Sequence, residues 1–497
     1  MNEIMTMRKA AIKGTLFLGA GRMADRGFQL LRNIIVARLV SPEDFGIAAL
    51  FVMTISLLEM ISNLAIDTLL IQSPEGENPR FQETSQLMTA VRGLGIAVIL
   101  FLFAIPVAGI FNIPEATWAF RLLAVVPLIR GLAHQDMARL QRQLNYKSLL
   151  MTDVISQLIS VLCAWPLAVW LGNYSAILYL IIIQVLARTI ISHITAERPY
   201  SWGWEPLHVH QIMAFGWPLL INGVLLFVIM QGDRFVIGAA DNLFSRVTYS
   251  KTLLGFYSAA FVLSSSIVDA ILSVLTPMIF PLLTSVQNDQ AQFQKRYRFC
   301  IHFYASISSI TGIFFILMGS WLMVLVYGKQ YAEAGLLMIC LGAMNSIRLF
   351  RTAPTTISLA KGDSRNPTVS NMFRALSFGM AFIFAAKGMD IAWIAASAII
   401  GELLAVLPSI VMLKYKFTIP MKHFIVPFIS ASAGLILAAL FWHFGLSNAT
   451  TLLAFIAAVS LSLCMLTFFL FLFDEFYNEI KTIVKPLLSR VSFKNLI

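Results

Sequence analysis

The sequence predicts an all-α polytopic membrane protein with about 14 transmembrane helices. Three observations lead to this prediction: 58% of the 497 residues are hydrophobic, only 12% are charged, and the mean hydropathy is +0.80. Soluble domains carry about 25% charged residues. Apolar segments, each long enough to cross about 30 Å of hydrocarbon, recur along the whole chain between short polar joints. No joint is long enough to hold a separate soluble domain.

The predicted spans follow one another from a first helix at roughly residues 13–38 to the end of the chain. Their centres lie near Phe28, Ser56, Ala97, Val126, Ser160, Ile183, Val224, Val268, Thr311, Gly342, Phe378, Ser397, Gly434 and Ser460. The first segment lacks the small-residue cleavage site of a signal peptide, so we expect it to stay in the mature protein. The four cysteines lie in apolar segments without metal-ligand spacing, which predicts neither a disulfide nor a metal site.

Loop charge predicts the orientation. If the N-terminus is cytoplasmic, most joint Lys and Arg residues fall on the cytoplasmic side, and the outer joints hold little beyond Arg246, Lys251, Lys329 and Lys387. This is the pattern of the positive-inside rule, and it favours an even number of helices with both termini in the cytoplasm. The net charge of +11 is then mostly topological, attracted to anionic membrane lipids, and no nucleic-acid partner is expected.

A weak internal repeat predicts how the helices are grouped. The second helix opens with FGIAALFV at 45–52, and the eighth opens with LGFYSAAF at 254–261. Because the motif recurs after six helices, an even number, both halves have the same orientation, which predicts two six-helix lobes related by a pseudo-two-fold axis along the membrane normal. We expect an N-terminal lobe, a cytoplasmic linker, a C-terminal lobe, two appended transmembrane helices and a basic cytoplasmic tail, at 1–197, 198–210, 211–416, 417–474 and 475–497.

The first helix carries charges that lipid does not tolerate. At about 100° per residue, Arg22, Asp25, Arg26 and Arg32 share one face, and apolar residues form the other. An arginine at the centre of a bilayer costs about 2.5–3.5 kcal/mol, so three facing lipid would cost roughly 7–10 kcal/mol. We therefore expect this face to line a cavity or to meet partner helices. Asp25 is either a structural partner of the arginines or a functional switch.

Arginine is the most frequent ionisable residue within the other apolar segments. Because its planar guanidinium donates paired hydrogen bonds and stays charged, a cavity lined by arginines is suited to an anion such as phosphate. We predict that the binding residues are Arg22, Arg26, Arg234, Arg348 and Arg351. Gating or ion coupling is assigned to Asp25, Asp233 and Glu402, although Asp233 and Arg234 could instead anchor neighbouring helices. Charged residues near helix ends are expected to snorkel to the interface or to cap helices; they are Asp67, Arg92, Arg121, Asp136, Asp153 and Arg188.

The sequence gives little support to catalysis. It contains no Walker loop, no Gly-x-Ser-x-Gly and no His-Glu-x-x-His motif. A membrane glycosyltransferase or ligase would also require a donor site and a long external loop, whereas the longest external joint, about residues 240–253, is short. We therefore predict a protein that is not an enzyme, with no cofactor beyond a coupling proton or sodium ion. No strong Gly-x-x-x-Gly seam is present, which favours a monomer.

Several motifs together resemble one family. They are ARLVSPEDFG at 37–46, RLQRQLNYK at 139–147, DRFVIG at 233–238, LGFYSAA at 254–260 and the stretch 334–362. Over essentially its full length the chain resembles the polysaccharide transporter branch, of Wzx type, in the superfamily that also holds the multidrug extruders and lipid II flippases. It is similar to the subgroup that includes the colanic acid exporter.

The resemblance implies a two-lobed flippase. Such a protein moves an undecaprenyl-diphosphate-linked oligosaccharide from the cytoplasmic to the periplasmic leaflet by alternating access, and it works with a polysaccharide polymerase and a chain-length regulator. The charged first helix resembles that of lipid II flippases, which implies a phosphate role for Arg22 and Arg26 and a gating role for Asp25. By the same analogy, the last two helices hold the lipid tail. A lipid II or teichuronic-type exporter is the alternative, and a multidrug cation exporter is disfavoured by the excess of arginine.

Overall fold

All regular secondary structure that the computed structural model describes is helical, and the described residues are 2–244, 249–446, 451–473, 477 and 481, without the side chains of 2–18, 20, 445 and 446. The predicted tail at 475–497 lies outside them apart from Tyr477 and Lys481. The elements are α1 (Asn2–Leu39), α2 (Pro42–Ile61), α3 (Ile66–Gln72), η1 (Pro74–Glu77), α4 (Pro79–Leu102), α5 (Ala104–Ile110), η2 (Pro114–Ala116), α6 (Thr117–Leu123), α7 (Val125–Gly131), α8 (Asp136–Arg142), α9 (Lys147–Leu171), α10 (Ser175–Ile194), α11 (Pro206–Leu243), α12 (Lys251–Thr284), α13 (Gln290–Tyr327), η3 (Lys329–Ala334), α14 (Gly335–Ala360), α15 (Arg365–Arg374), α16 (Leu376–Ala386), α17 (Ile391–Phe417), α18 (Lys422–Phe441), η4 (Trp442–Leu446) and α19 (Thr451–Leu472).

The structure confirms a multi-pass helical membrane protein. Among the described residues, 12 helices are long and apolar enough to cross a membrane, or 13 if the bent segment from Pro114 to Arg142 is one span. All 14 predicted centres fall in helices. The difference of one comes from α1, which has the length of a span but is not among these helices, and which carries Arg22, Asp25, Arg26 and Arg32 in its second half.

The chain divides into two compact units. Unit 1 comprises 1–266, 326–331 and 378–394, and unit 2 comprises 267–325, 332–377 and 395–497. These units are groups of packed residues, and the division into two six-helix lobes stays a prediction. We expected a linker at 198–210. The non-helical segment of the structure lies at 195–205, because α10 ends at Ile194 and α11 begins at Pro206.

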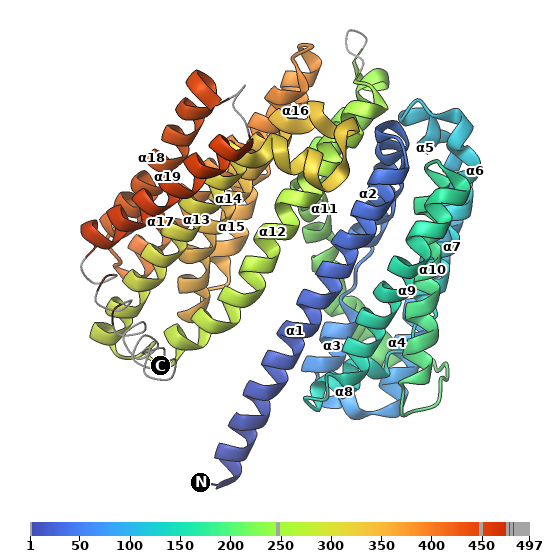
Figure 1. The fold of residues 1–497 in the computed structure, drawn as a ribbon. Coiled ribbons are helices and arrows are strands. Elements are labelled where there is room, and N and C mark those ends of the chain that lie inside the picture. The colour runs from blue at the N-terminus through green and yellow to red at the C-terminus, as the bar shows by residue number, and fades with distance from the viewer. Residues whose placement is uncertain (1, 245–248, 447–450, 474–476, 478–480, 482–497) are drawn as a thin grey trace, which may run out of the picture. The chain divides into compact units, whose positions relative to one another are not determined.

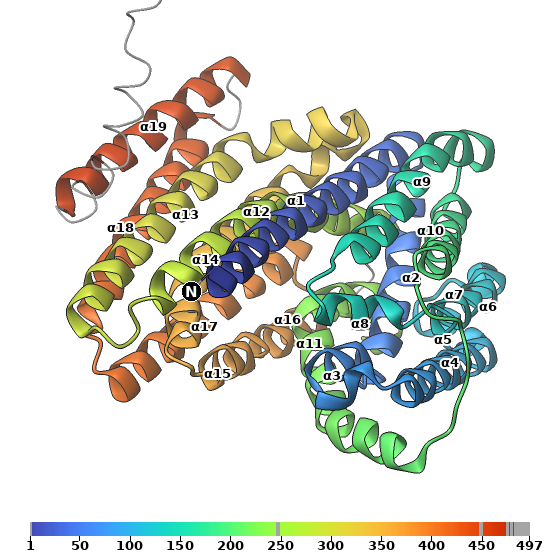
Figure 2. The ribbon, with the colours of Figure 1, turned by 90° about the horizontal axis from the view of Figure 1, so that it is seen from below.

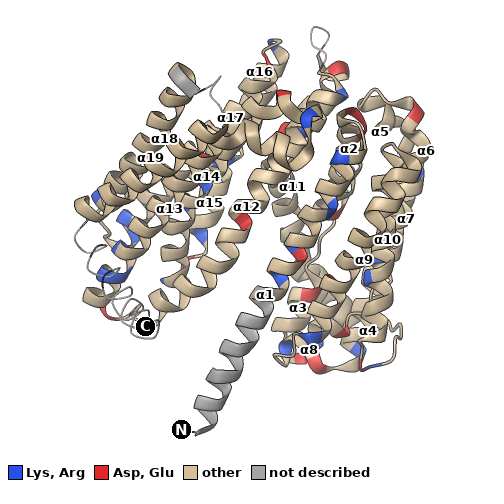
Figure 3. Ribbon diagram, viewed as in Figure 1, with Lys and Arg blue, Asp and Glu red and all other residues tan. Residues whose placement is uncertain are grey.

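In unit 1, α9 packs along both α1 and α10, and α4 packs along α7 (Figures 1 and 2). Small side chains allow the close approach of the first group. Val36 of α1 and Val40, just after its end, meet Ala164 and Ala168 of α9 and Ala176 of α10 in one buried cluster. Charged residues gather in the same unit around α3, α8 and the start of α4 (Figure 3).

The two copies of the internal repeat meet in unit 1 through their glycines. A Cβ atom added to Gly46 would lie 2.0 Å from the carbonyl oxygen of Lys251, and one added to Gly255 would lie 1.9 Å from the carbonyl oxygen of Pro42. Each glycine therefore makes room for the backbone of the other copy. A reciprocal contact of this kind is what a two-fold relation between equivalent segments produces.

The SPEDFG motif also fixes the start of α2. Ser41 is the N-cap, and its hydroxyl accepts a hydrogen bond from the amide of Asp44 at 3.1 Å, while Pro42 occupies the first helical position. The carboxylate of Asp44 in turn accepts the amide of Tyr174 at 3.1 Å, just before α10. The motif thus places the N-terminal ends of two helices of unit 1 against each other.

Unit 2 is centred on the buried helix α14. Ser346 of α14 donates to the carbonyl oxygen of Ser308 of α13 at 2.6 Å, and Ser308 donates back to the carbonyl oxygen of Ser346 at 2.8 Å. Gly434 of α18 packs against Ser309 of α13. The last two helices leave an apolar groove of about 600 Å³ between α18 and α19, lined by Leu437, Leu440, Phe441, Phe444, Leu453, Ile456 and Ala457.

Candidate functional site

A polar cavity of about 350 Å³ lies inside unit 1. Its wall comes from the segment after α2 and from α3, α4, α7, α8, α9 and α10. The charged groups on the wall are Asp67, Arg92, Arg130 and Arg188, with His134 beside them. Three guanidinium groups from three different helices therefore face one enclosed volume.

Arg130 and Arg188 each have a carboxylate partner. Arg130 donates a short hydrogen bond to Glu59 at the end of α2, and Arg188 lies 2.9 Å from Asp153 of α9. Both arginines remain partly accessible, with 38% and 41% of their side chains exposed. The Nε atom of Arg130 is buried and has no hydrogen-bond partner among the described residues. Each pair therefore keeps donors that a bound anion could use.

Arg92 is the least compensated of the three. Its Nη1 donates to the carbonyl oxygen of Ser62 at 3.4 Å, which is long for a hydrogen bond, and its Nε is buried without a partner. In the described part of the chain no carboxylate lies within ion-pair distance of it. Glu59 and Asp67 interact with the charge of Arg92 only at longer range, and its buried Nε has no described acceptor, so this position favours an anion in the cavity.

Asp67 is the acidic group on the cavity wall. It lies in the short helix α3, outside the membrane-spanning helices, after a turn in which Ala65 has φ +49° and donates its amide to Asn63 at 2.9 Å. Its carboxylate opens onto the cavity and has no ion-pair or hydrogen-bond partner among the described residues. The surrounding protein raises the pKa of Asp67 by desolvation, which Arg188 and Arg92 only partly oppose.

The charged face of α1 separates into two parts. Arg22 and Arg26 are exposed, and Arg26 donates a long hydrogen bond to Gln29 at 3.4 Å. Arg32 is instead turned toward α10 and α9, where it donates to Gln184 at 2.7 Å and to Ser160 at 3.4 Å. Asp25 is half-buried and interacts electrostatically with Asp153 and Arg188. It is therefore linked to the cavity through the Asp153–Arg188 pair.

Asp233 and Arg234 belong to α11 and contact α12 within unit 1. The hydroxyl of Tyr257 donates to Asp233, and the guanidinium of Arg234 stacks 4.1 Å from the ring centroid of Phe261. Arg234 is 8% exposed and donates to the carbonyl oxygen of Met230 at 2.6 Å. The structure thus places this predicted site pair in a helix-to-helix contact, the alternative that the sequence left open.

The predicted arginines of unit 2 are in ion pairs. Arg348 lies 2.6 Å from Asp269, and Arg351 lies 2.7 Å from Glu402. Glu402 is fully buried and also lies 2.7 Å from Arg374. This carboxylate is therefore ion-paired with two arginines, and its burial indicates a structural charge cluster.

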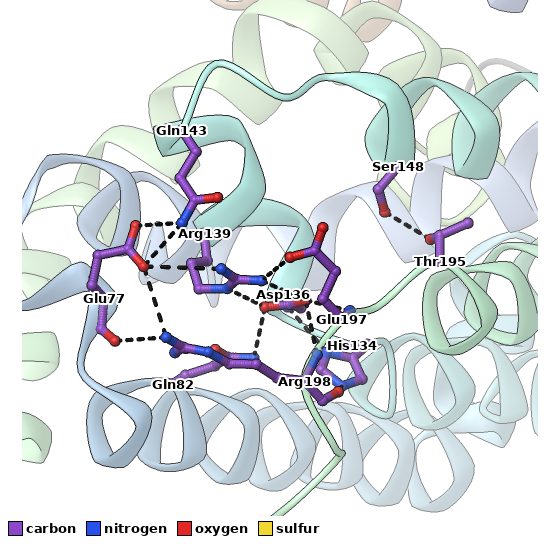
Figure 4. Close-up of polar contacts among 10 residues, drawn as sticks. All are labelled: Glu77, Gln82, His134, Asp136, Arg139, Gln143, Ser148, Thr195, Glu197 and Arg198. Atoms are coloured by element: carbon purple, nitrogen blue, oxygen red, sulfur yellow. Dashed lines mark hydrogen bonds and ion pairs between the residues drawn. The ribbon is translucent and has the colours of Figure 1, made fainter.

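Beside the cavity, a second polar cluster holds the non-helical segment after α10. Asp136 is fully buried and accepts hydrogen bonds from Arg139 at 2.5 Å and from the amides of Glu197 at 2.8 Å and Arg198 at 3.3 Å (Figure 4). Arg198 continues to Gln82 at 3.0 Å. Because the buried carboxylate of Asp136 accepts hydrogen bonds from several donors within the protein, it does not snorkel, and it joins α8 to α4 and to the non-helical segment after α10.

The sequence therefore missed the residues that meet in unit 1. Arg92 and Arg188 were expected to snorkel or cap at helix ends, and no role was assigned to Arg130. They are distant in the sequence and belong to no common motif. The available signal was the number of arginines in apolar segments.

Comparison with known proteins shows the family. Residues 35–335 match the family model for polysaccharide biosynthesis proteins. The teichuronic acid biosynthesis protein TuaB of Bacillus subtilis is 22% identical, covering 85% of this chain and 87% of that protein. The lipopolysaccharide biosynthesis protein WzxC of Escherichia coli is 22% identical, covering 62% and 60%, and the succinoglycan biosynthesis transport protein ExoT of Rhizobium meliloti is 23% identical, covering 53% and 52%.

Solved structures show the fold. The lipid II flippase MurJ in an inward closed conformation has a TM-score of 0.70 at 14% identity, covering 91% of this chain and 98% of that chain. An inward-facing multidrug resistance transporter of the MATE family, of the MOP superfamily, has a TM-score of 0.62 at 13% identity, covering 82% and 94%. These findings confirm the resemblance predicted from the sequence motifs: the chain belongs to the family of polysaccharide biosynthesis proteins and has the fold of the MOP superfamily.

Proposed function

We propose that the protein is a flippase that moves undecaprenyl-diphosphate-linked oligosaccharide units from the cytoplasmic to the periplasmic leaflet of the inner membrane by alternating access. The observation that carries the proposal is the unit 1 cavity, where Arg92, Arg130 and Arg188 surround a volume suited to a phosphate-bearing group. The names of the relatives, which refer to polysaccharide biosynthesis and transport, support the substrate class.

The chemistry of the cavity matches the difficult part of such a substrate. A diphosphate cannot enter hydrocarbon without losing its hydration, and guanidinium groups replace those water contacts with charge-assisted hydrogen bonds. Arg92 offers a guanidinium without a carboxylate partner in the described part of the chain, and Arg188 offers one that is 41% exposed. Arg22 and Arg26 stay in the proposed site because they are exposed on α1, which packs against α9.

The residues engaged in contacts have a different role in this proposal. Arg348 and Arg351 would have to leave Asp269 and Glu402 before binding an anion, and Arg234 would have to leave the ring of Phe261. We assign these three arginines to holding the helices together. Of the three acids proposed for gating or coupling to a proton or sodium ion, we favour Asp25, because it interacts with Asp153 and Arg188 beside the cavity.

The apolar groove between α18 and α19 supports a role for the last two helices in holding a lipid chain. Its described lining is aliphatic and aromatic, and its volume of about 600 Å³ accommodates part of a polyprenyl tail. A photoreactive polyprenyl analogue should therefore label residues of this groove. Labelling spread evenly over the other lipid-facing helices would remove the groove from the proposal.

Transport of a short fluorescent polyprenyl-diphosphate oligosaccharide in proteoliposomes tests the function. Arg92→Gln and Arg188→Gln should lower the flipping rate by about tenfold or more, since a hydrogen bond to a charged group contributes about 1.5–3 kcal/mol. Arg121→Gln is the matched control, because Arg121 is an exposed arginine of unit 1 outside this cavity. Native protein that flips no such substrate would contradict the function, and normal flipping by both variants would contradict the site.

A teichuronic-type exporter is the second candidate. It is favoured by the alignment with TuaB, which covers most of both chains. The same arginines would serve either substrate, since both functions require recognition of a lipid-linked anion. The flipping rates of two polyprenyl-diphosphate carriers, one with a neutral glycan and one with a uronic acid-rich glycan, separate the two functions in the same set of proteins. Only the glycan differs between the two carriers.

A further inference from the structure

Unit 2 contains a polar pocket at the ends of its helices. It has a volume of about 420 Å³, within the usual size of small-ligand pockets. Three joints form it: the turn from α12 to α13 with the first turns of α13, the turn after α14, and the connection from α17 to α18. Two candidate spans separate each joint from the next, so all three lie on one side of the membrane. The loop charges predict that this side is cytoplasmic, where the proposed substrate is loaded.

Amide side chains form the rim of this pocket. Gln287 and Asn288 lie in the turn before α13, and Gln290 and Gln294 lie one helical turn apart on α13. The first three are exposed and Gln294 is half-buried. None of the four amide groups forms a hydrogen bond with a described residue. Because each amide has two N–H donors and one carbonyl acceptor, the rim presents both kinds of hydrogen-bonding group to a ligand.

Aromatic side chains close the pocket toward the protein. Phe293 and Tyr297 are each 3% exposed, and they line the pocket together with the half-buried Phe417. The ammonium group of Lys361 lies 4.1 Å from the ring centroid of Phe293 and donates to the carbonyl oxygen of Gln287. Lys361 is the only charged residue of the described lining, and these two contacts engage it. The described lining therefore offers amides and aromatic surface to a ligand.

The connection from α17 to α18 adds a strained residue beside Phe417. Thr418 has φ +54°, a left-handed conformation that is costly for a β-branched residue, and its hydroxyl donates to the carbonyl oxygen of Phe417 at 2.7 Å. The next residue, Ile419, is 5% exposed and lines the same pocket. Strained residues persist where the surrounding structure fixes them, and they cluster at ligand sites. The shape of this loop therefore supports a binding role for the pocket.

We propose that this pocket binds a neutral sugar of the oligosaccharide that the lipid diphosphate carries, so that unit 2 provides a docking site for the glycan. The proposal rests on the proposed function. A sugar ring has adjacent hydroxyls that each donate and accept a hydrogen bond, which the amides of the rim match. Its C–H faces bury apolar area against an aromatic ring, which Phe417 offers. An anion, by contrast, finds no unengaged cationic group in the described lining.

Binding of soluble sugars tests the pocket without transport. Full-length protein is purified in a detergent without a sugar headgroup, because maltoside and glucoside detergents would compete for the pocket. Saturation-transfer NMR is then recorded with cellobiose, lactose or glycerol at about 10 mM, which detects a dissociation constant of about 1 mM. We expect saturation transfer to at least one of the two disaccharides and none to glycerol, which has hydroxyls but no ring.

Variants test the assigned residues. Gln290→Ala with Gln294→Ala should weaken disaccharide binding about tenfold, because two amide hydrogen bonds are lost. Gln292→Ala changes an exposed glutamine of α13 that does not line the pocket, and this matched control should bind like the parent. Thermal unfolding identifies folded variants, and Gln290→Ala alone keeps the test valid if the double variant is unfolded. Arg92→Gln, in the unit 1 cavity, should leave disaccharide binding unchanged.

Photolabelling assigns the source of the sugar. An isoprenyl diphosphate that carries the disaccharide with a photoreactive group on its sugar should label the peptide that contains residues 287–297. Excess soluble disaccharide should prevent this labelling, and the double variant should lower it about tenfold. Labelling of this peptide by a photoreactive soluble disaccharide, but not by the isoprenyl-linked one, would assign the pocket to a free sugar.

Two further results would overturn the proposal. Absence of saturation transfer to both disaccharides in the folded parent would exclude a sugar site in this pocket. Equal transfer in the parent and in a folded double variant would place the sugar elsewhere. These measurements do not depend on flipping or on the arginines of unit 1. A failure of the docking site and a failure of the proposed function can therefore be told apart.

Discussion

Arginines occur in both units, but their surroundings differ. In unit 1, Arg92 lines a cavity, and its buried Nε atom has no acceptor among the described residues. The side chain of Arg188, on the same cavity, is 41% exposed. In unit 2, Arg351 and Arg374 share the fully buried Glu402. Arginines of unit 1 are therefore available to a ligand, whereas those of unit 2 are held in ion pairs within the protein. The two groups of arginines differ in their access to water and in the positions of their counter-ions.

The largest effect is expected where charges are buried and paired. Glu402→Gln removes the carboxylate that neutralises Arg351 and Arg374, and leaving buried charges unpaired costs about 3–5 kcal/mol. We expect the thermal transition of the purified protein to fall strongly, or folded protein to be lost. Glu333→Gln, at an exposed glutamate of unit 2, is the control and should change little. A stable Glu402→Gln variant would mean that unit 2 does not depend on this cluster.

The next effect separates binding from stability. Arg92→Gln should weaken binding of a short isoprenyl diphosphate by about tenfold or more while leaving the thermal transition close to that of the parent, because Arg92 has no described carboxylate partner to strand. Arg351→Gln should do the reverse. Titration calorimetry and thermal unfolding of both variants provide the comparison. If both variants lost stability and kept binding, the two arginine sites would not differ in the way that we infer.

Asp67 gives the cavity a predicted pH dependence. Because desolvation raises the pKa of Asp67, this group becomes neutral at a higher pH than an ordinary aspartate, and the cavity then carries more net positive charge. Diphosphate affinity should fall as the pH rises through the pKa of Asp67, by about fivefold for an interaction of roughly 1 kcal/mol. Asp67→Asn should bind tightly throughout and show only the titration of the ligand itself. The same pH profile in parent and variant would assign the dependence to another group.

The smallest effect concerns a charge at a helix connection of unit 2. Asp363 is 3% exposed and accepts hydrogen bonds from Lys416 at 2.7 Å and from the amide of Arg365 at 3.1 Å. Desolvation opposes its ionisation, but these donors lower its pKa below the usual value. Its contribution is therefore present at neutral pH and lost as the pH falls through the lowered pKa.

Asp363→Asn should therefore destabilise the protein by about 1 kcal/mol at pH 7. The cost is small because half of Lys416 is exposed and the ion pair is screened. In acid the cost should be smaller, because the parent protein then loses the charge of Asp363 as well. Thermal unfolding at pH 7 and at the lowest pH where the parent stays folded checks this. A cost that did not shrink in acid would mean that the side chain acts through its shape and neutral hydrogen bonds.

The sequence predicted the fold better than the site because the two depend on different information. The apolar length of a span is a local property, so all 14 centres could be placed in helices. The start of α2 was also encoded locally, by the Ser41 cap and Pro42. Whether an arginine is compensated depends on distant residues: Glu59 and Asp153 reach Arg130 and Arg188 from other helices. Spacing within one helix carries no record of these partners, so Arg92 and Arg351 could not be told apart.

The reciprocal contact of Gly46 and Gly255 has a consequence for the history of the chain. A side chain at either glycine would run into the backbone beside the other, at 2.0 Å and 1.9 Å. Substitution of either glycine alone would cause a steric clash, and substitution of both would cause two. If the two halves arose by duplication, mutation could erase similarity elsewhere while this junction kept its ancestral residue in both copies. The repeat is then visible at these helix starts because interlocking surfaces evolve as a single unit.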